Sequence, residues 1–197
     1  MDDLYQTLWQ EMQNLETIGV FFGLISVGLT VKENIWCWPF GILNVILFGW
    51  IFFKSAIYGQ MILQSFFFIL ILYGWYQWLY GKENNKSISI KNINGKEILV
   101  SIPVTILTAI IIAFGIRFFS AKENFTTLDS LITALSFTAQ YFLAKKIIEN
   151  WIIWVLIDII SVFLFIQTGL YKIGFFYFLL SILATTGYIS WKKKLAN

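Results

Sequence analysis

A carboxylate in the middle of a hydrophobic run constrains this chain more than any other feature. The run covers residues 150–169, NWIIWVLIDIISVFLFIQTG, and Asp158 lies near its centre. About 20 helical residues, at about 1.5 Å rise each, span the hydrocarbon core of a bilayer. A charged side chain at that depth costs roughly 2.5–3.5 kcal/mol even on a lenient insertion scale. We therefore expect Asp158 to face a cavity and to have a function there.

Two tryptophans share a helical face with this carboxylate, because Trp151, Trp154 and Asp158 stand at positions i, i+3 and i+7. Indole rings attract flat cations by stacking and cation–π interaction, and a carboxylate neutralises their charge. The face predicts a binding site for a planar, positively charged ring. A competing interpretation places Trp151 in the aromatic belt at the membrane interface. Trp154 lies one turn deeper and fits the belt less well.

The composition indicates an integral membrane protein, since 58% of the residues are hydrophobic and only 13% are charged. Soluble domains carry about 25% charged residues. The net charge of +3 falls between apolar runs, so we expect it to set topology and expect no nucleic-acid partner. Histidine is absent and Cys37 is the only cysteine, which excludes an intrachain disulfide and a cysteine–histidine metal site. With no phosphate-binding loop either, we expect no metal, no cofactor and no enzyme activity.

Seven apolar segments predict an all-α integral membrane protein with seven transmembrane helices. The segments cover about residues 17–31, 35–53, 57–80, 98–116, 128–144, 150–169 and 173–191. Residues 1–16 are acidic and amphipathic, so we predict an interfacial helix there and no cleavable signal. The expected organisation is a three-helix bundle over 17–80, a hydrated cytoplasmic linker over 81–97, a linking helix and loop over 98–127, and a second three-helix bundle over 128–197.

Basic residues predict the orientation in the membrane. With seven alternating spans, one side receives ten basic residues: Lys32, Lys82, Lys86, Lys91, Lys96, Lys145, Lys146, Lys192, Lys193 and Lys194. The other side receives four: Lys54, Arg117, Lys122 and Lys172. Lysine and arginine are enriched in cytoplasmic loops, so the C-terminus is predicted inside and the N-terminus outside.

A weak internal repeat indicates two copies of a three-helix unit joined by the fourth span. Tyr58 stands sixteen residues before Gly74, Tyr171 stands sixteen before Gly187, and Trp78 then corresponds to Trp191. With one gap allowed, Asn44 falls opposite Asp158. A single joining span gives both copies the same orientation, a 3+1+3 parallel repeat, and transporters commonly place their site between such repeats. Chance is the competing explanation, because aromatic residues are abundant here.

Several polar side chains lie inside the other predicted spans. They are Asn44, Gln60, Gln64, Thr133, Ser136 and Gln140. Polar residues in membrane helices often serve only as hydrogen bonds between helices, and for Thr133 and Ser136 alone we favour that interpretation. For Asp158, Gln64 and Asn44 we favour a substrate pathway. The aromatic cluster at the end of the third span, which includes Trp78, is typical of the interfacial belt.

Two long segments, residues 38–78 and 128–171, closely resemble the PnuC family of bacterial vitamin transporters. The resemblance implies two three-helix bundles joined by a linking helix, similar to SWEET sugar transporters, and placement in the bacterial inner membrane. It also implies facilitated diffusion of nicotinamide riboside, thiamine or another vitamin, and homotrimers. A cytosolic kinase would trap the arriving substrate by phosphorylation, without a required complex.

Within that resemblance, the family motif tryptophan-x-x-tryptophan-x-x-x-asparagine falls on Trp151, Trp154 and Asp158, with aspartate in place of asparagine. The family's polar positions in the second and third spans fall on Asn44 and Gln64. We expect a passive transporter for a cationic vitamin, nicotinamide riboside first and thiamine second. The expected substrate-binding residues are Trp151, Trp154, Asp158, Asn44, Gln64, Gln140, Gln60, Thr133 and Ser136. A membrane sensor that transports nothing is the remote alternative.

Overall fold

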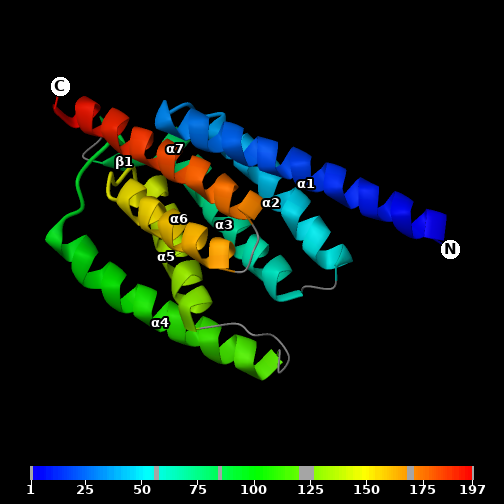
Figure 1. The fold of residues 1–197 in the computed structure, drawn as a ribbon. Helices are drawn as coiled ribbons and strands as arrows, with labels where there is room; N and C mark the ends of the chain where they lie inside the picture. The colour runs from blue at the N-terminus through cyan, green and yellow to red at the C-terminus, as the bar shows by residue number, and fades with distance from the viewer. Residues whose placement is uncertain (1, 56–57, 84–85, 120–126, 168–170, 197) are drawn as a thin grey trace.

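The computed structural model describes residues 2–55, 58–83, 86–119, 127–167 and 171–196, and within them it has seven helices and one very short hairpin (Figure 1). The helices are α1 (Asp2–Val31), α2 (Cys37–Lys54), α3 (Tyr58–Tyr80), α4 (Gly95–Phe119), α5 (Thr127–Ala144), α6 (Asn150–Gln167) and α7 (Tyr171–Ala196). The hairpin pairs β1 (Lys82–Glu83) with β2 (Lys86–Ser87). The predicted seven-helix fold is confirmed.

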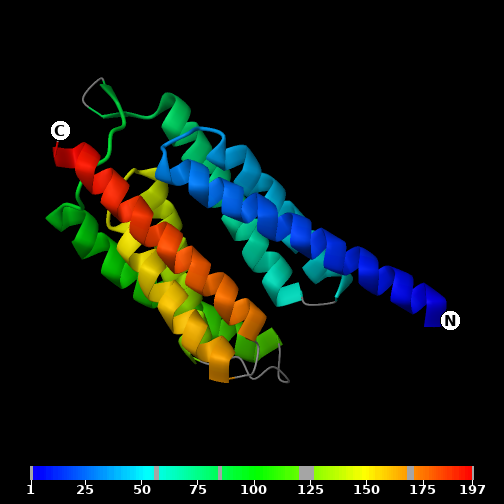
Figure 2. The ribbon, with the colours of Figure 1, turned by 45° about the horizontal axis from the view of Figure 1, so that its top comes forward.

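Six of the described helices are long and apolar enough to cross a membrane: α1, α2, α3, α4, α6 and α7. The seventh, α5, carries the predicted site residues Thr133, Ser136 and Gln140, and it packs against α3, α4 and α6. Residues 1–16 and 17–31 were predicted as separate segments, but α1 continues from Asp2 to Val31 without a break. Its N-terminal part extends beyond the bundle (Figure 2). Its placement in the membrane interface stays a prediction.

Six helices form a closed ring, because each packs against two neighbours in the order α1, α2, α3, α5, α6, α7 and back to α1. The linking helix α4 packs on α5 and lies outside this ring (Figure 1). A ring of this kind directs one face of each helix towards a common centre. The outward faces carry large exposed apolar side chains, as expected for surfaces that meet lipid.

The two halves of the ring are copies of one unit, and the loops that precede α2 and α6 show this most clearly. Glu33 and Lys146 stand 113 positions apart, and both have a left-handed backbone, with φ of 56° and 54°. The Glu33 amide donates to the Thr30 carbonyl at 2.9 Å, and the Lys146 amide donates to the Leu143 carbonyl at 3.0 Å. Thr30 and Leu143 are also 113 positions apart. The parallel repeat of α1–α3 and α5–α7 is therefore confirmed.

The register of the repeat corrects the sequence alignment. Helices α2 and α6 both have 18 residues, and their first residues, Cys37 and Asn150, stand 113 positions apart. The same separation relates Trp78 to Trp191, so no residue is inserted between these points. Val45, and not Asn44, is then the counterpart of Asp158. The gap that aligned Asn44 with Asp158 was wrong because it matched two polar residues rather than two positions on the helix.

The linker after α3 is fastened to the second bundle. The Lys91 amide donates to the Lys146 carbonyl at 3.0 Å, and the Ile148 amide donates to the Lys91 carbonyl at 2.9 Å. The Glu149 carboxylate accepts a hydrogen bond from the Ile93 amide at 2.9 Å. Helix α4 then begins at Gly95, earlier than predicted, because Asn94 and Glu97 exchange side-chain to backbone hydrogen bonds as a capping box. The predicted linker of 81–97 is therefore partly structured.

Candidate substrate site between the two bundles

A cavity of about 420 Å³ lies in the middle of the ring. All six ring helices line it, and α4 contributes none of the described lining residues. Its polar lining includes Ser26, Thr30, Asn44, Gln60, Gln64, Ser136, Gln140, Asp158, Ser161 and Tyr177. Of the polar residues predicted for the site, Asn44, Gln60 and Gln64 line the cavity from α2 and α3, and Ser136, Gln140 and Asp158 line it from α5 and α6. The ring brings them together although they are far apart in the sequence.

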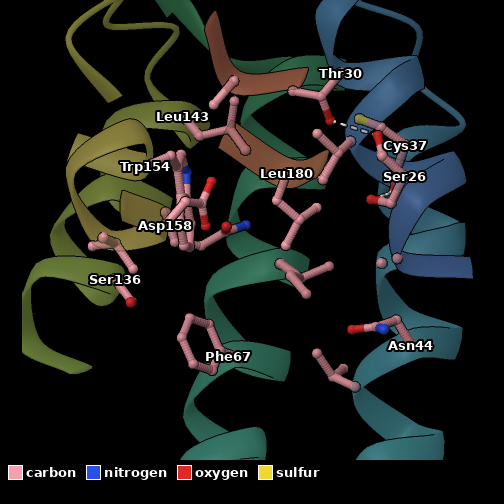
Figure 3. Close-up of a pocket in the computed structure, with 18 of the residues that line it drawn as sticks. Ser26, Thr30, Cys37, Asn44, Phe67, Ser136, Leu143, Trp154, Asp158 and Leu180 are labelled. Carbon is pink, nitrogen blue, oxygen red and sulfur yellow. Dashed lines mark hydrogen bonds between the residues drawn. The ribbon is translucent and has the colours of Figure 1, made fainter. Parts of the chain in front are cut away.

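Asp158 is the charged group of this cavity. Its side chain projects from α6 beside Trp154, and Asn44 lies on the opposite side of the cavity (Figure 3). Only 3% of the residue is exposed. The described lining residues include no lysine or arginine, and within the described chain no cation forms a salt bridge with this carboxylate. An unpaired buried anion favours a ligand that brings a positive charge.

The two tryptophans of the motif have different environments. Trp154 is half-buried and lines the cavity beside Asp158. Trp151 is only 2% exposed, and its ring lies directly on Gly187, where an added Cβ would stand 2.6 Å from the ring. Trp191 meets the same indole edge-on, with ring centroids 5.5 Å apart. The belt interpretation of Trp151 was therefore wrong. Trp154 is the ring with a face available to a ligand, and Trp151 forms part of the cavity wall.

The predicted amide and hydroxyl groups divide into two kinds. Gln60, Gln64 and Gln140 line the cavity and are half-buried. Asn44 also lines it, but its Nδ2 donates to the Gly19 carbonyl of α1 at 2.8 Å. The Ser136 hydroxyl, in the lining as well, donates to the Ile132 carbonyl of its own helix at 2.9 Å. One of the two N–H donors of Asn44 and the hydroxyl donor of Ser136 are therefore already used within the protein, and their oxygens remain as acceptors.

Thr133 is the predicted site residue that does not line the cavity. Its hydroxyl donates to the Asp129 carbonyl within α5 at 2.9 Å. The lining residues of α5 are Ile132, Ser136, Gln140 and Leu143. The predicted residues Ser136 and Gln140 therefore lie on the lining face of α5, and Ile132 rather than Thr133 lies there with them.

Sequence reasoning missed Tyr177, the polar residue that α7 places in the lining. Its ring stacks on Phe165 of α6, with centroids 5.4 Å apart and planes 14° from parallel. The repeat contained the signal, because Gln64 on α3 is the counterpart of Tyr177, 113 positions earlier. Phe67 and Leu180, both lining residues, correspond in the same way. Carrying the predicted site residue Gln64 of α3 onto its counterpart in α7 would have identified the position.

Four buried or half-buried tryptophans close one end of the cavity, and we call them the tryptophan clamp: Trp38, Trp78, Trp151 and Trp191. In the first bundle Trp38 meets Trp78 edge-on at 5.3 Å and 87°. In the second bundle Trp151 meets Trp191 at 5.5 Å and 88°. Trp78 and Trp191 meet each other at 6.3 Å and join the pairs. The belt interpretation of Trp78 was therefore wrong, because this ring lies between the bundles.

Crossed hydrogen bonds fasten the clamp to both bundles. The Trp78 Nε1–H donates to the Leu143 carbonyl of α5 at 3.2 Å, and the Trp191 Nε1–H donates to the Thr30 carbonyl of α1 at 3.3 Å. These two bonds are equivalent under the repeat, since donors and acceptors are each 113 positions apart. Each bundle therefore holds a carbonyl of the other through the same geometry.

An ion-pair network covers the clamp at the same end. Glu33 accepts hydrogen bonds from Lys146 at 2.8 Å and from Lys194 at 2.6 Å. Burial raises the pKa of the Glu33 carboxyl, but the two lysines outweigh burial and hold that pKa below its ordinary value. The network joins the loop before α2 to the loop before α6 and to the end of α7. Lys146 and Lys194, two of the ten basic residues predicted to share one side, both contact Glu33 at this end.

Comparison with known proteins gives the family. Residues 13–193 match the family described as nicotinamide mononucleotide transporter. The chain is 29% identical to the nicotinamide riboside transporter PnuC of Escherichia coli K12, over 90% of this chain and 84% of the relative. It is 26% identical to the riboflavin/roseoflavin transporter RibM of Streptomyces davaonensis, over 93% of this chain and 84% of that one.

A solved structure supports the same fold. The crystal structure of the vitamin B3 transporter PnuC matches with a TM-score of 0.73 at 18% identity, and the match covers 96% of this chain and 85% of that one. Multiple apolar helices, the ring with its central cavity and the match over nearly the whole length all agree. The chain belongs to the nicotinamide mononucleotide transporter family of multi-pass membrane proteins.

Proposed function

We propose that this protein carries nicotinamide riboside into the bacterial cytoplasm by facilitated diffusion, and that later phosphorylation by a cytosolic kinase traps the substrate. The observation that carries the proposal is the Asp158 carboxylate beside Trp154, in a cavity enclosed by six helices and without a cation in its described lining. The pyridinium ring of the riboside is flat and positively charged. It would stack on Trp154 while Asp158 neutralises its charge.

The remaining polar groups suit the rest of the riboside. Gln64 and Gln140 present amides from opposite bundles, and each amide both donates and accepts hydrogen bonds. These groups would bind the carboxamide and the ribose hydroxyls, with Gln60 beside them on α3. Asn44 would accept a hydrogen bond through its free oxygen from across the cavity. A volume of about 420 Å³ lies within the range of roughly 300–1,000 Å³ that is usual for small-molecule sites.

Transport would proceed by alternating access, in which the two bundles rock about the cavity. The end closed by the tryptophan clamp carries the larger share of basic residues and would face the cytoplasm. Nε1 of Trp38 and Nε1 of Trp151 are buried there with no hydrogen-bond partner among the described residues. Unsatisfied buried donors cost free energy, so this closed end is less stable than the packing of its four indole rings alone implies. That property suits an end that must open in every cycle.

The relatives support the riboside over other vitamins. The Escherichia coli relative is named as a nicotinamide riboside transporter, whereas the Streptomyces davaonensis relative is named for riboflavin and roseoflavin. The flavin ring is neutral and gives an unpaired carboxylate nothing to neutralise. Thiamine carries a cationic ring and is therefore the competitor that a test must include. The homotrimer expected from the resemblance stays a prediction.

Calorimetric titration of the purified full chain tests this proposal, with nicotinamide riboside, thiamine and riboflavin as ligands. We expect saturable binding of the riboside. Trp154→Ala should weaken it about 5- to 30-fold, since a desolvated cation–π contact contributes roughly 1–2 kcal/mol. Trp50→Ala is the matched control, because Trp50 is half exposed on the outer face of α2 and lies outside the cavity lining.

The possible outcomes distinguish the candidate substrates from one another and a transporter from a sensor. Binding of thiamine alone would replace the proposed substrate with the competitor. Binding of none of the three ligands would refute the vitamin site. Binding without saturable uptake into proteoliposomes would favour a membrane sensor over a transporter.

A further inference from the structure

The linker between the two bundles decides which helices move together when the cavity opens. This inference rests on the alternating access proposed above and not on the identity of the vitamin. We propose that the protein opens as two unequal bodies. One body is α1–α3, and the other is α5–α7 together with α4 and residues 90–93 of the linker, which we call the strap. The strap stays attached to the second bundle throughout the cycle, and the joint between the bodies lies between the end of α3 and the strap.

Three hydrogen bonds join the strap to the loop between α5 and α6. Two involve the backbone of Lys91, and in the third the Ile93 amide donates to the Glu149 carboxylate. Lys91 also forms a parallel β-bridge with Ile147, which is fully buried. Ile90, at the start of the strap, packs against the buried core. The strap is therefore part of the packed structure of the second bundle.

Helix α4 belongs to the same body. In its first turn, the Glu97 carboxylate pairs with the Lys91 ammonium group of the strap at 3.0 Å. Farther along, the hydroxyl oxygens of Thr105 on α4 and Thr138 on α5 lie 2.6 Å apart, and α5 is the helix on which α4 packs. Hydrogen bonds between helices stabilise their association within a bilayer. Helix α4 is thus attached to the second bundle both at its start and along its length.

The equivalent loop of the first bundle, residues 32–36, is held differently. Its described backbone hydrogen bonds run within the loop and to α1 and α2, as in the 2.9 Å bond from the Asn34 amide to the Leu29 carbonyl. The counterpart of Glu149 in this loop is Trp36, which is 62% exposed. The two loops are copies, but the described backbone bonds of the strap go to the second one. The strap therefore makes the two bodies unequal.

This division lets the clamp open at the smallest cost in broken bonds. Opening must separate the crossed indole bonds and the ion pairs of Glu33, which join the two bodies at this end. A strap that moved with α1–α3 would in addition lose its three hydrogen bonds and uncover Ile147. Buried backbone groups that lose their partners cost free energy, so the favoured movement keeps the strap on the second bundle.

Two cross-links in the full chain test the division, each by uptake of nicotinamide riboside into proteoliposomes. A disulfide in the double variant Lys91→Cys with Ile147→Cys ties the strap to the second bundle. Bridged strands lie about 4.8 Å apart, within the Cα separation of about 4.4–6.8 Å that a disulfide spans. In Glu33→Cys with Lys194→Cys, a short reducible bifunctional thiol reagent ties the two bodies across the clamp. Each variant is compared with itself after reduction, and the single-cysteine variants are the matched controls.

We expect the strap disulfide to leave the initial uptake rate within about twofold of the reduced protein, because the linked parts move as one body. The cross-link over the clamp should lower uptake at least about tenfold until reduction restores it, since a carrier must open at each end in turn. A strap disulfide that blocks uptake reversibly would overturn the division, and so would undiminished uptake with the clamp cross-linked.

Amide hydrogen exchange provides a second measurement that needs no introduced cysteine. The amides of Lys91, Ile93 and Ile148 should exchange at the same rates in Trp191→Phe, which weakens the clamp, as in the unchanged protein. Faster exchange at all three amides in this variant would show that the strap opens with the clamp and would overturn the division. Absence of riboside uptake by the unchanged protein would instead overturn the proposed function, and the exchange rates would still decide the division.

Discussion

The two three-helix bundles are copies of one repeat, but equivalent positions of α2 and α6 carry the same residue at the clamp and different residues in the cavity. At the clamp, Trp38 and Trp151 occupy equivalent positions, and each ring lies on an equivalent glycine, Gly74 or Gly187. One turn and two turns deeper along α2 and α6, the bundles diverge. Gly41 is the counterpart of Trp154, and Val45 is the counterpart of Asp158.

The difference between the clamp and the cavity shows that closing the cavity and binding a substrate place different requirements on the two bundles. A closure between two rocking bundles must fit both of them, so equivalent residues meet each other across the pseudo-symmetry axis, as Trp78 meets Trp191 and Glu33 meets Lys146. A vitamin has no twofold symmetry, so a site that holds it in one orientation must have unlike walls. The second bundle supplies the ring and the charge, while the first bundle lines the cavity with Gly41 and Val45 at the equivalent positions.

The largest effect on riboside binding is expected when α2 and α6 present the same side chains to the cavity. Asp158→Val copies the residue of the first bundle and should weaken riboside binding at least about 30-fold, because removing one partner of a buried charge pair costs roughly 2–5 kcal/mol. The exchanged variant, Asp158→Val with Val45→Asp, should not recover binding, since its acid would stand beside Gly41 rather than a tryptophan. Calorimetry measures both variants. Full recovery in the exchanged variant would show that the walls are interchangeable.

The clamp glycines should matter almost as much, this time for stability. An alanine at Gly74 would overlap the Trp38 ring, and an alanine at Gly187 would come within 2.6 Å of the Trp151 ring. Overpacking of this kind costs roughly 1–3 kcal/mol, which opposes the gain in helix propensity. Both variants should lower the thermal midpoint of the protein in detergent. Gly28→Ala is the control, because nothing lies within 4 Å of its added Cβ. A loss from only one of the two clamp variants would show that the bundles do not share this contact.

The crossed indole bonds should contribute less and should contribute equally. Trp78→Phe and Trp191→Phe each keep a ring and remove one N–H donor, at a cost of about 1 kcal/mol. That cost should raise the opening equilibrium of the clamp about fivefold. Cys37, the sole cysteine, is buried in the cavity wall, so its rate of labelling by a maleimide reports opening. Trp50→Phe is the control on the outer face. Unequal rates for the two clamp variants would break the proposed equivalence.

The smallest effect concerns the pH dependence of the ion pairs. The pKa of Glu33 lies below its ordinary value of 4.5, so its contribution to stability is present above about that pH and is lost as the pH falls through the lowered pKa. Thermal midpoints between about pH 6 and pH 3 should therefore fall less steeply in Glu33→Gln than in the unchanged protein. Glu16→Gln, on an exposed part of α1, should retain the original slope. If the thermal midpoints of all three proteins fell equally steeply with pH, Glu33 would not stabilise the closed end.

Much of the fold was predictable because a membrane imposes local rules. A spanning segment must satisfy its own backbone hydrogen bonds and match the bilayer thickness, so the length and apolarity of each segment identify the helices. The cost of burying Asp158 likewise indicates a cavity without any knowledge of neighbours. The exclusion of Thr133 from the cavity was not predictable in this way. Ile132 and Thr133 both lie about one turn before Ser136, and only the packing of the helices shows that Ile132 lines the cavity.

From its residues alone, the chain determined the seven helices, the repeat and the deep acid that shares a helix face with two tryptophans, because each follows from the spacing of residues along the sequence. Only the tertiary structure decided that Val45 is the counterpart of Asp158, that Trp151 and Trp78 belong to a clamp rather than an interfacial belt, and that Tyr177 faces the cavity. The physical reason is that the surroundings of these residues depend on how the six helices close into a ring. In that ring, α1 packs on α7 and α3 packs on α5 across long separations in the sequence.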